Sequence, residues 1–251
     1  MFKATGLLTF LLLLTVFALA DEPRYQNAFI SSDGKYEASL RDDRNWYLIE
    51  KSTGKELYHF SDYYRDGIWF SSMTLVVGDS GRNVVAINDY GEQDFRKNPE
   101  VLFFFRDGKQ FRTYRLFEIA NPKFMEFSVS HFSWFYSRKQ LSIHDSTLEI
   151  TTFDMNHLVF NSVTGSLIRK SLDNVLSGGA IFVAGPIRSL ESKTSLEISV
   201  KCSIYGNVKV GSKIRFESEK FRWVGGTSYE SVILQDGKLV DRKGVIFNNC
   251  Y

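Results

Sequence analysis

Residues 101–114 have the sequence VLFFFRDGKQFRTY. An apolar run ends in the turn Asp107-Gly108-Lys109, and a second run with spaced apolar residues follows it. Gly accepts the positive φ that tight hairpin turns require, and an Asp before it can hydrogen-bond the local backbone. Aromatic residues on both sides fit the half-buried surface of a sheet. The stretch therefore predicts a β-hairpin.

The same turn pattern recurs along the chain. A small oxygen-bearing residue precedes Gly, and in most cases a basic residue follows: Asp33-Gly34-Lys35, Thr53-Gly54-Lys55, Ser80-Gly81-Arg82, Asp107-Gly108-Lys109, Thr164-Gly165-Ser166 and Asp236-Gly237-Lys238. Gly54, Gly81 and Gly108 follow one another at intervals of 27 residues, and Gly165 comes 57 residues after Gly108. Such regularity indicates a loosely repeated unit of two hairpins, as in the blade of a β-propeller.

Between the turns lie short runs in which apolar residues recur at or near every second position, which is typical of strands. These runs are residues 35–40, 45–50, 68–77, 83–87, 101–105, 147–152 and 157–160. Aromatic residues make up 15% of the chain and Pro is scarce, so the composition also favours β structure. We expect little helix: a short one within residues 112–119 and a turn at 172–176. The predicted fold class is all-β, an antiparallel meander of hairpins.

Two segments carry a resemblance to a known family. Ser32-Asp33-Gly34-Lys35-Tyr36, followed by a strand that ends in the residues KSTGKEL at 51–57, resembles the repeat of WD-repeat-like and quinoprotein-like β-propellers. Residues 148–165 repeat its second half, so the resemblance covers about residues 28–170. The Gly-His and Trp-Asp pairs of WD repeats are missing, and the stretch is too short for a closed ring of four or more blades at ~40 residues each. A partial propeller, an open meander and a β-sandwich are all compatible with the pattern.

A break in the pattern divides the chain. Residues 172–179 end in Gly178-Gly179, Pro186 follows, and regular alternation returns at 195–201 and 208–216. The predicted organisation is a signal peptide at residues 1–20, a hairpin-repeat, propeller-like domain at 21–186, and a small C-terminal β module at 187–251.

The first twenty residues match a cleavable secretory signal. Lys3 precedes an apolar run at residues 7–17, and Ala18-Leu19-Ala20 supplies the small residues that signal peptidases require. The run is shorter than the ~20 residues that span a bilayer, and no second run of spanning length follows. We expect an exported protein, periplasmic or extracellular, without a transmembrane segment after cleavage.

Cysteines and charge narrow the options further. Cys202 and Cys250 are the two cysteines of the chain, and an oxidising compartment would let them form a disulfide, which would stabilise the C-terminal segment by about 4 kcal/mol. Two unrelated thiols are the alternative.

Without Lys3 the chain has 30 basic and 29 acidic residues. This near neutrality gives no reason to expect nucleic acid as a partner.

No catalytic or metal-binding set emerges from the motifs. Gly78-Asp79-Ser80-Gly81 imitates the nucleophile loop of chymotrypsin-like proteases, but only His59 precedes Ser80, without the setting that such a base requires. A hairpin turn is the simpler interpretation. The four histidines, at positions 59, 131, 144 and 157, are scattered and lack ligand-pair spacing. We predict no catalytic residues, no metal and no cofactor.

Two groups of aromatic residues remain. One lies at residues 58–70 and the other at 132–136. Such rings usually fill a core, but exposed ones can stack on a sugar or contact a partner. Because charged residues flank Tyr63, Tyr64 and Trp69, these three are the predicted ligand-binding residues. Our hypothesis is a non-enzymatic exported binding or interaction module for an unidentified protein or glycan; a carbohydrate-binding module and a hydrolase are the alternatives.

The signal interpretation predicts the first residue of the mature protein. Cleavage after Ala20 should leave Asp21 at the N-terminus, because Ala18 and Ala20 occupy the third and first positions before the cut. Intact-mass spectrometry of the exported chain measures this directly. A mature chain that still begins at Met1 would contradict the interpretation.

Overall fold

The computed structural model describes residues 26–65, 69–88, 94–127, 132–135, 141–190, 194–205, 208–219 and 228–242. The predicted signal peptide and Cys250 lie outside these residues, so signal cleavage and the pairing of the two cysteines stay predictions. In the described part of the chain, no helix has the length and apolar character needed to cross a membrane.

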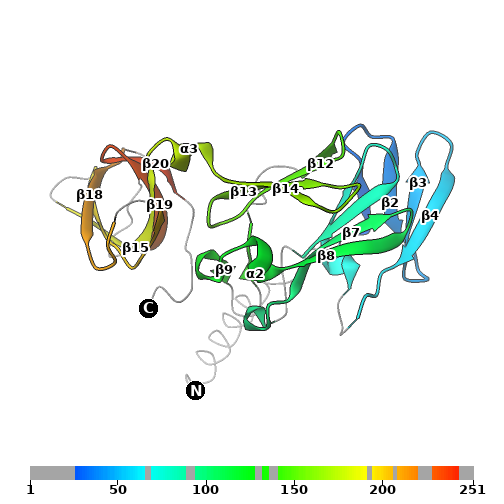
Figure 1. Ribbon diagram of the computed structural model, residues 1–251, viewed down its shortest axis with the longest axis horizontal. Helices are drawn as coiled ribbons and strands as arrows, with labels where there is room; N and C mark the ends of the chain where they lie inside the picture. Colours follow the sequence, from blue (N-terminus) through cyan, green and yellow to red (C-terminus); the bar gives the residue numbers. More distant parts are fainter. Residues whose placement is uncertain are drawn as a thin grey trace, which may run out of the picture.

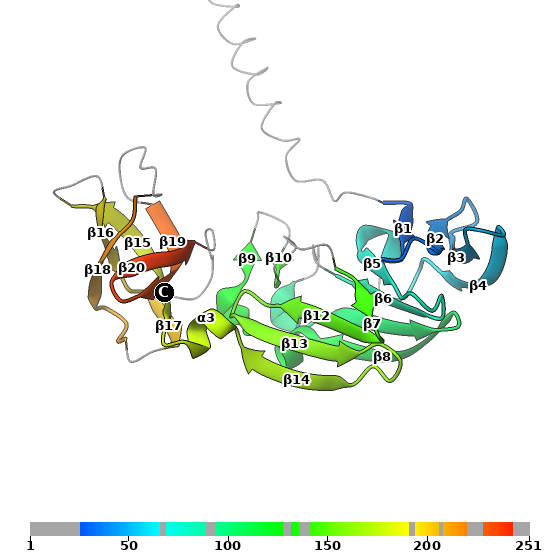
Figure 2. The same cartoon turned by 90° about the horizontal axis from the view of Figure 1, so that it is seen from above.

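Three sheets of four antiparallel strands follow one another along the described chain (Figures 1 and 2). In each sheet every strand pairs with its neighbours in sequence, as in the blade of a propeller. Blade 1 contains β1 (Ala28–Ile30), β2 (Tyr36–Leu40), β3 (Asn45–Glu50) and β4 (Lys55–Ser61). Blade 2 contains β5 (Thr74–Val77), β6 (Asn83–Ile87), β7 (Glu100–Arg106) and β8 (Lys109–Arg115). Blade 3 contains β11 (Ile143–His144), β12 (Thr147–Thr151), β13 (Asn156–Asn161) and β14 (Leu167–Leu172).

The C-terminal module is a six-stranded sheet in the order β16-β18-β20-β19-β15-β17, with a further pairing of β15 to β16. Its strands are β15 (Ile181–Ser189), β16 (Ser195–Ser199), β17 (Cys202–Tyr205), β18 (Lys213–Glu217), β19 (Ser228–Gln235) and β20 (Lys238–Arg242). The all-β class and the C-terminal β module are thereby confirmed.

Short elements connect the sheets. They are η2 (Phe70–Ser72), η3 (Phe95–Lys97), α2 (Leu116–Ile119), η4 (Pro122–Phe124), the strand pair β9 (Glu126–Phe127) and β10 (Phe132–Ser133), and α3 (Asn174–Ser177). The helix expected within residues 112–119 is shorter than that range, because the β7–β8 ladder continues as far as Arg115.

Blade 2 lies between the other two blades and is buried on both faces. Alternate residues of β7 point to opposite sides: Phe103 and Phe105 belong to a core shared with blade 1, while Leu102 and Phe104 belong to a core shared with blade 3. Strand β6 is buried along its whole length. This explains why the quoted stretch has a continuous apolar run, and it makes the three blades a partial propeller instead of a two-sheet sandwich.

Turn glycines sit where one blade meets the preceding one. Gly108, in the β7–β8 turn, has φ +78°, and an added Cβ would lie 2.5 Å from the carbonyl oxygen of His59 on β4. Gly165, in the β13–β14 turn, meets Arg112 of β8 in the same way. Gly54, in the equivalent β3–β4 turn, has φ +69° and no atom within 4 Å of that position. The structural repeat is therefore the interval of 54 to 57 residues from Gly54 to Gly108 to Gly165, and each repeat contains two hairpins, as expected.

The predicted boundary between residues 186 and 187 falls inside β15. This strand pairs with β19 from Ile181 to Ile187, so the C-terminal sheet begins before Pro186. Pro186 lies where the other edge of β15 changes partner, from β17 at Ala184 to β16 at Ile187. A residue without an N–H is tolerated at such an interruption of the ladder.

Substituting the two equivalent glycines tests the blade contact. Gly54→Ala should cost roughly 1 kcal/mol, the price of a left-handed conformation alone. Gly108→Ala should cost about 3 kcal/mol, because its Cβ also displaces the backbone of β4. Urea denaturation of both variants measures the difference; equal losses of stability would contradict the packing of blade 2 on blade 1.

Candidate functional site

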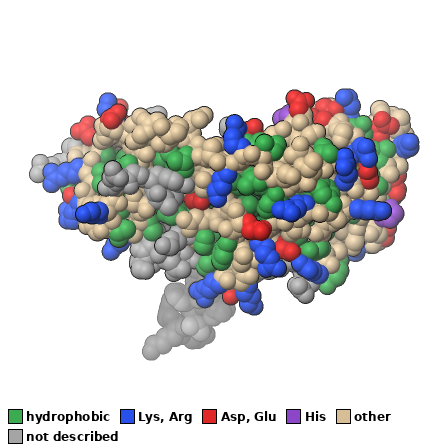
Figure 3. Space-filling model, in the orientation of Figure 1, with side chains coloured by type: hydrophobic (Ala, Val, Ile, Leu, Met, Phe, Trp, Pro, Cys, Tyr) green, Lys and Arg blue, Asp and Glu red, His purple; other side chains and the backbone are tan. Residues whose placement is uncertain are grey.

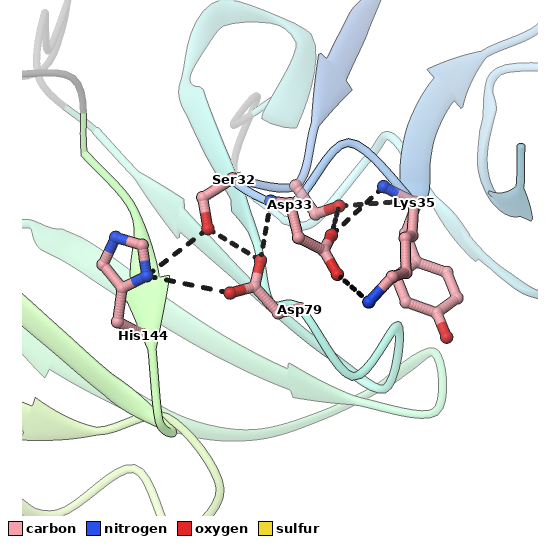
Figure 4. A network of polar contacts seen from close by, with 7 residues as sticks. Ser32, Asp33, Lys35, Asp79 and His144 are labelled. Atoms are coloured by element: carbon pink, nitrogen blue, oxygen red, sulfur yellow. Dashed lines mark hydrogen bonds and ion pairs between the residues drawn. The ribbon is translucent and has the colours of Figure 1, made fainter.

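A polar network joins the three blades (Figure 4). Ser32 and Asp33 come from the β1–β2 turn, Asp79 from the β5–β6 turn and His144 from β11. The Ser32 hydroxyl donates to Asp79 Oδ1 at 2.7 Å, and the backbone N–H of Asp33 donates to the same oxygen at 3.2 Å. His144 Nδ1 lies 3.5 Å from Ser32 Oγ and 3.7 Å from Asp79 Oδ2. We call these four residues the inter-blade network.

The negative charge of Asp33, at the edge of this network, is balanced by Lys35. Lys35 Nζ lies 2.8 Å from Asp33 Oδ2, and the Ser31 hydroxyl donates to Asp33 Oδ1 at 2.8 Å. The hydrogen bonds from Lys35 and Ser31 lower the pKa of Asp33 to about 2. Asp33 therefore stays ionised at any physiological pH, and its partners Lys35 and Ser31 belong to the same turn.

The network has the composition of a Ser-His-Asp triad but not its geometry. A triad needs the serine on one imidazole nitrogen and the carboxylate on the other, so that the ring can pass a proton between them. Here Nδ1 of His144 is the nitrogen nearest to both Ser32 and Asp79, and the serine donates directly to the carboxylate. The arrangement can hold two turns and β11 together; it does not generate an activated serine.

The protease-like motif behaves as a turn. Gly81 N–H donates to the carbonyl of Gly78 at 3.0 Å, and the Ser80 hydroxyl accepts from the backbone N–H of Arg82 at 3.3 Å. The carboxylate that contacts other blades belongs to Asp79, and its serine partner is Ser32, 47 residues away. Sequence reasoning missed this combination, because its members come from three separate blades. The one available signal was that Ser32 and Asp79 lie in the first hairpin turn of a blade and that His144 lies directly before such a turn.

A second site is exposed on blade 1. Tyr63 and Trp69 form an isolated antiparallel bridge, their ring centroids lie 5.1 Å apart, and the planes are inclined by 59°. Tyr63 is 47% exposed and Trp69 38% exposed. The guanidinium of Arg44 lies 5.0 Å from the centre of the Trp69 ring. We call Arg44, Tyr63 and Trp69 the Trp69 surface.

The buried carboxylate of Asp62 holds the backbone beside Trp69 in place through hydrogen bonds. Asp62 is completely buried and accepts hydrogen bonds from Trp46 Nε1 at 2.9 Å, from Ser71 N–H at 2.6 Å and from the Ser71 hydroxyl at 2.9 Å. Arg44 Nη1 lies 3.5 Å from its second oxygen. Because Asp62 and Ser71 lie on either side of the Tyr63–Trp69 bridge in sequence, these bonds fix the base of the segment that presents the two rings.

The third predicted ligand-binding residue lies elsewhere. Tyr64 is only partly buried, but its ring packs on Phe103 at 5.2 Å and on Phe70 at 5.9 Å, at the edge of the core between blades 1 and 2. In the second aromatic group, Trp134 and Phe135 are fully buried. Thus Tyr63 and Trp69 are brought together at the surface, whereas Tyr64 contributes mainly to packing.

Metal ligation finds no support among the described residues, where no three His, Cys, Asp or Glu side chains group as ligands would. His59 and His157 each lie beside one glutamate, Glu56 at 3.6 Å and Glu149 at 3.3 Å. His131 lies outside the described residues. Cys202 is buried on β17.

Comparisons with known proteins identify no family: no family model matches the sequence. No curated protein matches it either. Similar solved structures include the RRP9 WD40 repeats, with 9% identity, a TM-score of 0.32, and coverage of 86% of this chain and 62% of that one. A second is the β-propeller domain of Cps50 (Swd1) from Myceliophteria thermophila, with 13% identity, a TM-score of 0.29, and coverage of 69% of this chain and 49% of that one. A third is BamB from Moraxella catarrhalis, with 12% identity, a TM-score of 0.31, and coverage of 87% of this chain and 63% of that one. The chain spans less than two thirds of the length of these structures.

Removing one carboxylate tests the inter-blade network. Asp79→Ala deletes the acceptor of the Ser32 hydroxyl and the Asp33 N–H, and should lower the free energy of unfolding by about 1–3 kcal/mol. Ser80→Ala, one residue along the same turn, removes a single local bond and should cost about 0.5 kcal/mol or less. Thermal melts of both variants provide the measurement. An unchanged melting temperature of Asp79→Ala would show that the network does not stabilise the packing of the blades.

Proposed function

We propose that this chain is an exported, non-enzymatic interaction module that binds a partner protein through the Trp69 surface. The observation that carries the proposal is a pair of contacting, exposed rings held on a well-supported segment. Most large rings among the described residues are buried between the blades or at their edges. A rigid, exposed aromatic pair is what a binding surface needs, because little conformational entropy is lost when a partner covers it.

The geometry favours a protein over a glycan. A sugar stacks on a flat, open aromatic face, but Arg44 lies over the Trp69 ring and Tyr63 is inclined to it by 59°. Trp, Tyr and Arg are the residues enriched at the energetic centres of protein interfaces. Arg44 also brings a positive charge that is 62% exposed beside the rings. A partner that offers an apolar side chain next to a carboxylate would complement all three residues.

Export is the second part of the proposal. It is supported by the order of Lys3, the apolar run at 7–17 and Ala18-Leu19-Ala20. A disulfide between Cys202 and Cys250 would fit the same compartment. The non-enzymatic character is supported by the position of His144, whose Nδ1 is the ring nitrogen that faces both Ser32 and Asp79.

Removing either aromatic ring should weaken the capture of the partner. When the mature protein is immobilised and exposed to an extract of its own compartment, Trp69→Ala and Tyr63→Ala should each lower the affinity for the partner by roughly tenfold to thirtyfold, the usual cost of losing a central aromatic contact. Phe117→Ala removes a ring that is 42% exposed on α2 and serves as the matched control. Quantitative mass spectrometry of the eluates gives the comparison.

Three results would overturn the proposal. Equal capture by wild type and Trp69→Ala would remove the Trp69 surface from binding. Binding on a glycan array that Trp69→Ala abolishes would instead favour a carbohydrate-binding module. Hydrolytic turnover that is lost in Ser80→Ala or Ser32→Ala would show that the protein is an enzyme.

A further inference from the structure

The C-terminal sheet closes on itself. β16 and β17 run antiparallel to successive parts of β15, so they act as one interrupted second strand. β16 pairs with β18, β18 pairs in parallel with β20, β20 pairs with β19, and β19 returns to β15. This is a five-stranded Greek-key barrel in which β16, β17 and β18 form the face that barrels of this topology commonly use for ligands.

The inside and outside of this face are clearly separated. Leu196, Ile198 and Phe216 point into the barrel core. Their neighbours point outward, and they line up across three strands: Arg188 on β15 lies opposite Glu197 on β16, which lies opposite Arg215 on β18. The outward row therefore alternates base, acid, base.

Three bases converge on the single carboxylate. Arg188 Nη2 lies 2.6 Å from Glu197 Oε1, Lys213 Nζ lies 3.5 Å from it, and Arg215 Nε lies 3.7 Å from Oε2. The Glu197 side chain is 5% exposed, while those of Arg188, Lys213 and Arg215 are 53%, 58% and 77% exposed. We call these three bases the basic face. They cover the acid and remain open to solvent.

The basic face carries surplus positive charge. Burial of Glu197 opposes its ionisation, but hydrogen bonding to Arg188 and the charges of Arg188 and Lys213 hold its pKa below the ordinary value. Glu217, at the end of β18, is a second acid on the outward row and lies opposite Ser195. Glu197 and Glu217 thus balance two of the three positive charges, and the row keeps a net charge of +1. Lys201, at the junction of β16 and β17, and Lys209, before β18, are further exposed bases on the same stretch of chain. In Figure 3, Lys and Arg side chains gather at the left end of the molecule, where Figure 1 places β18.

The outward residues of β16 and β18 indicate how a ligand would be recognised. Besides the four charged residues Glu197, Lys213, Arg215 and Glu217 they are Ser195 and Ser199, and none of the six is aromatic. Nucleobases are usually bound by stacking on aromatic rings, which this row does not supply. Guanidinium groups bind carboxylate, sulfate and phosphate in a bidentate manner, and hydroxyls can bond sugar hydroxyls.

We propose that the basic face of the C-terminal barrel binds an acidic polysaccharide, through the anionic groups of successive sugars. This binding is independent of the Trp69 surface, which lies on blade 1. It also explains why near neutrality of the whole chain does not exclude an anionic ligand: the surplus is local to one face of one module.

Neutralising two bases tests the proposal. The double variant Lys213→Gln/Arg215→Gln leaves Arg188 to pair with Glu197, so the barrel should still fold. It should bind a heparin oligosaccharide about tenfold more weakly than wild type at low salt, as expected for the loss of about 1.4 kcal/mol. Lys55→Gln/Lys109→Gln removes the same charge from exposed turns of blades 1 and 2 and should bind like wild type. Circular dichroism checks that both variants fold.

Each outcome bears on the assignment. Selective loss in Lys213→Gln/Arg215→Gln, with binding unchanged in Trp69→Ala, would support it and would stand even if the proposed protein partner is not found. Equal weakening in both double variants, or no binding of heparin by wild type, would overturn it. Tighter binding of a single-stranded DNA oligonucleotide than of heparin would overturn the choice of a polysaccharide. Chemical shifts of Arg188, Lys213 and Arg215 that do not move on addition of heparin would also do so.

Discussion

The packing of blade 2 between its neighbours is the constraint on which the blade region depends. Phe103 and Phe105 fill one interface and Leu102 and Phe104 fill the other, so neither face of β7 can be exposed without losing a core. The candidate sites depend on the same packing. Phe70, next to Trp69 in sequence, packs against Phe103 at 5.4 Å and Phe105 at 5.1 Å, which ties the Trp69 surface to blade 2.

The outer faces of blades 1 and 3 carry charged and hydrogen-bonding side chains, unlike the apolar faces that pack on blade 2. On blade 1, the residues that alternate with the core include Glu37 and Tyr47; Glu37 lies 3.6 Å from Lys51, and Arg41 lies 3.8 Å from the Tyr47 ring centre. On blade 3 the equivalent face carries the Glu149–His157 pair. Charged and hydrogen-bonding groups are costly to bury, so these faces do not require a further blade. A short arc can therefore exist with its ends in water.

Much of the fold could be predicted because its signals are local. The turn at Asp107-Gly108 and the alternation on either side of it fix a hairpin without information from elsewhere, and the strands at 36–40, 45–50 and 83–87 were expected almost to the residue. The unit of two hairpins was expected, but the spacing of the glycines does not show where a blade begins: Gly81 belongs to the first hairpin of blade 2, while Gly54 and Gly108 belong to last hairpins. Only the pairing of the strands assigns each turn to a blade.

The candidate sites were less predictable, because they depend on which turns meet in space. Tyr63 and Trp69 could be chosen from the charges around them, but the same pattern also selected Tyr64, whose ring packs at the edge of the core. Ser32, Asp79 and His144 share only their position in or beside the first hairpin turn of a blade, which does not show that they meet in space. The basic face was hidden by the charge balance of the whole chain, since bases from β15 and β18 become neighbours only when the barrel closes.

The blades and the barrel meet in an apolar joint. Phe124 and Met155 on the blade side pack with Phe182 and Ile233 of the barrel, and the Phe124 and Phe182 rings lie 5.6 Å apart. The turn that presents Met155 is organised by the neighbouring buried carboxylate of Asp154. Burial raises the pKa of that carboxyl, against the opposing effect of hydrogen bonds from the side chains of Thr152 and Asn156 and the backbone of Asn121.

An apolar joint of this kind resists hinge motion, because opening it would expose the rings to water. The strands β3 and β4 of blade 1 lie at one end of the molecule and β18 at the other (Figure 1). A protein bound at the Trp69 surface and a polysaccharide bound at the basic face, as proposed above, would then lie on different parts of the molecule, one on blade 1 and the other on the barrel. The two ligands would therefore not compete for the same residues.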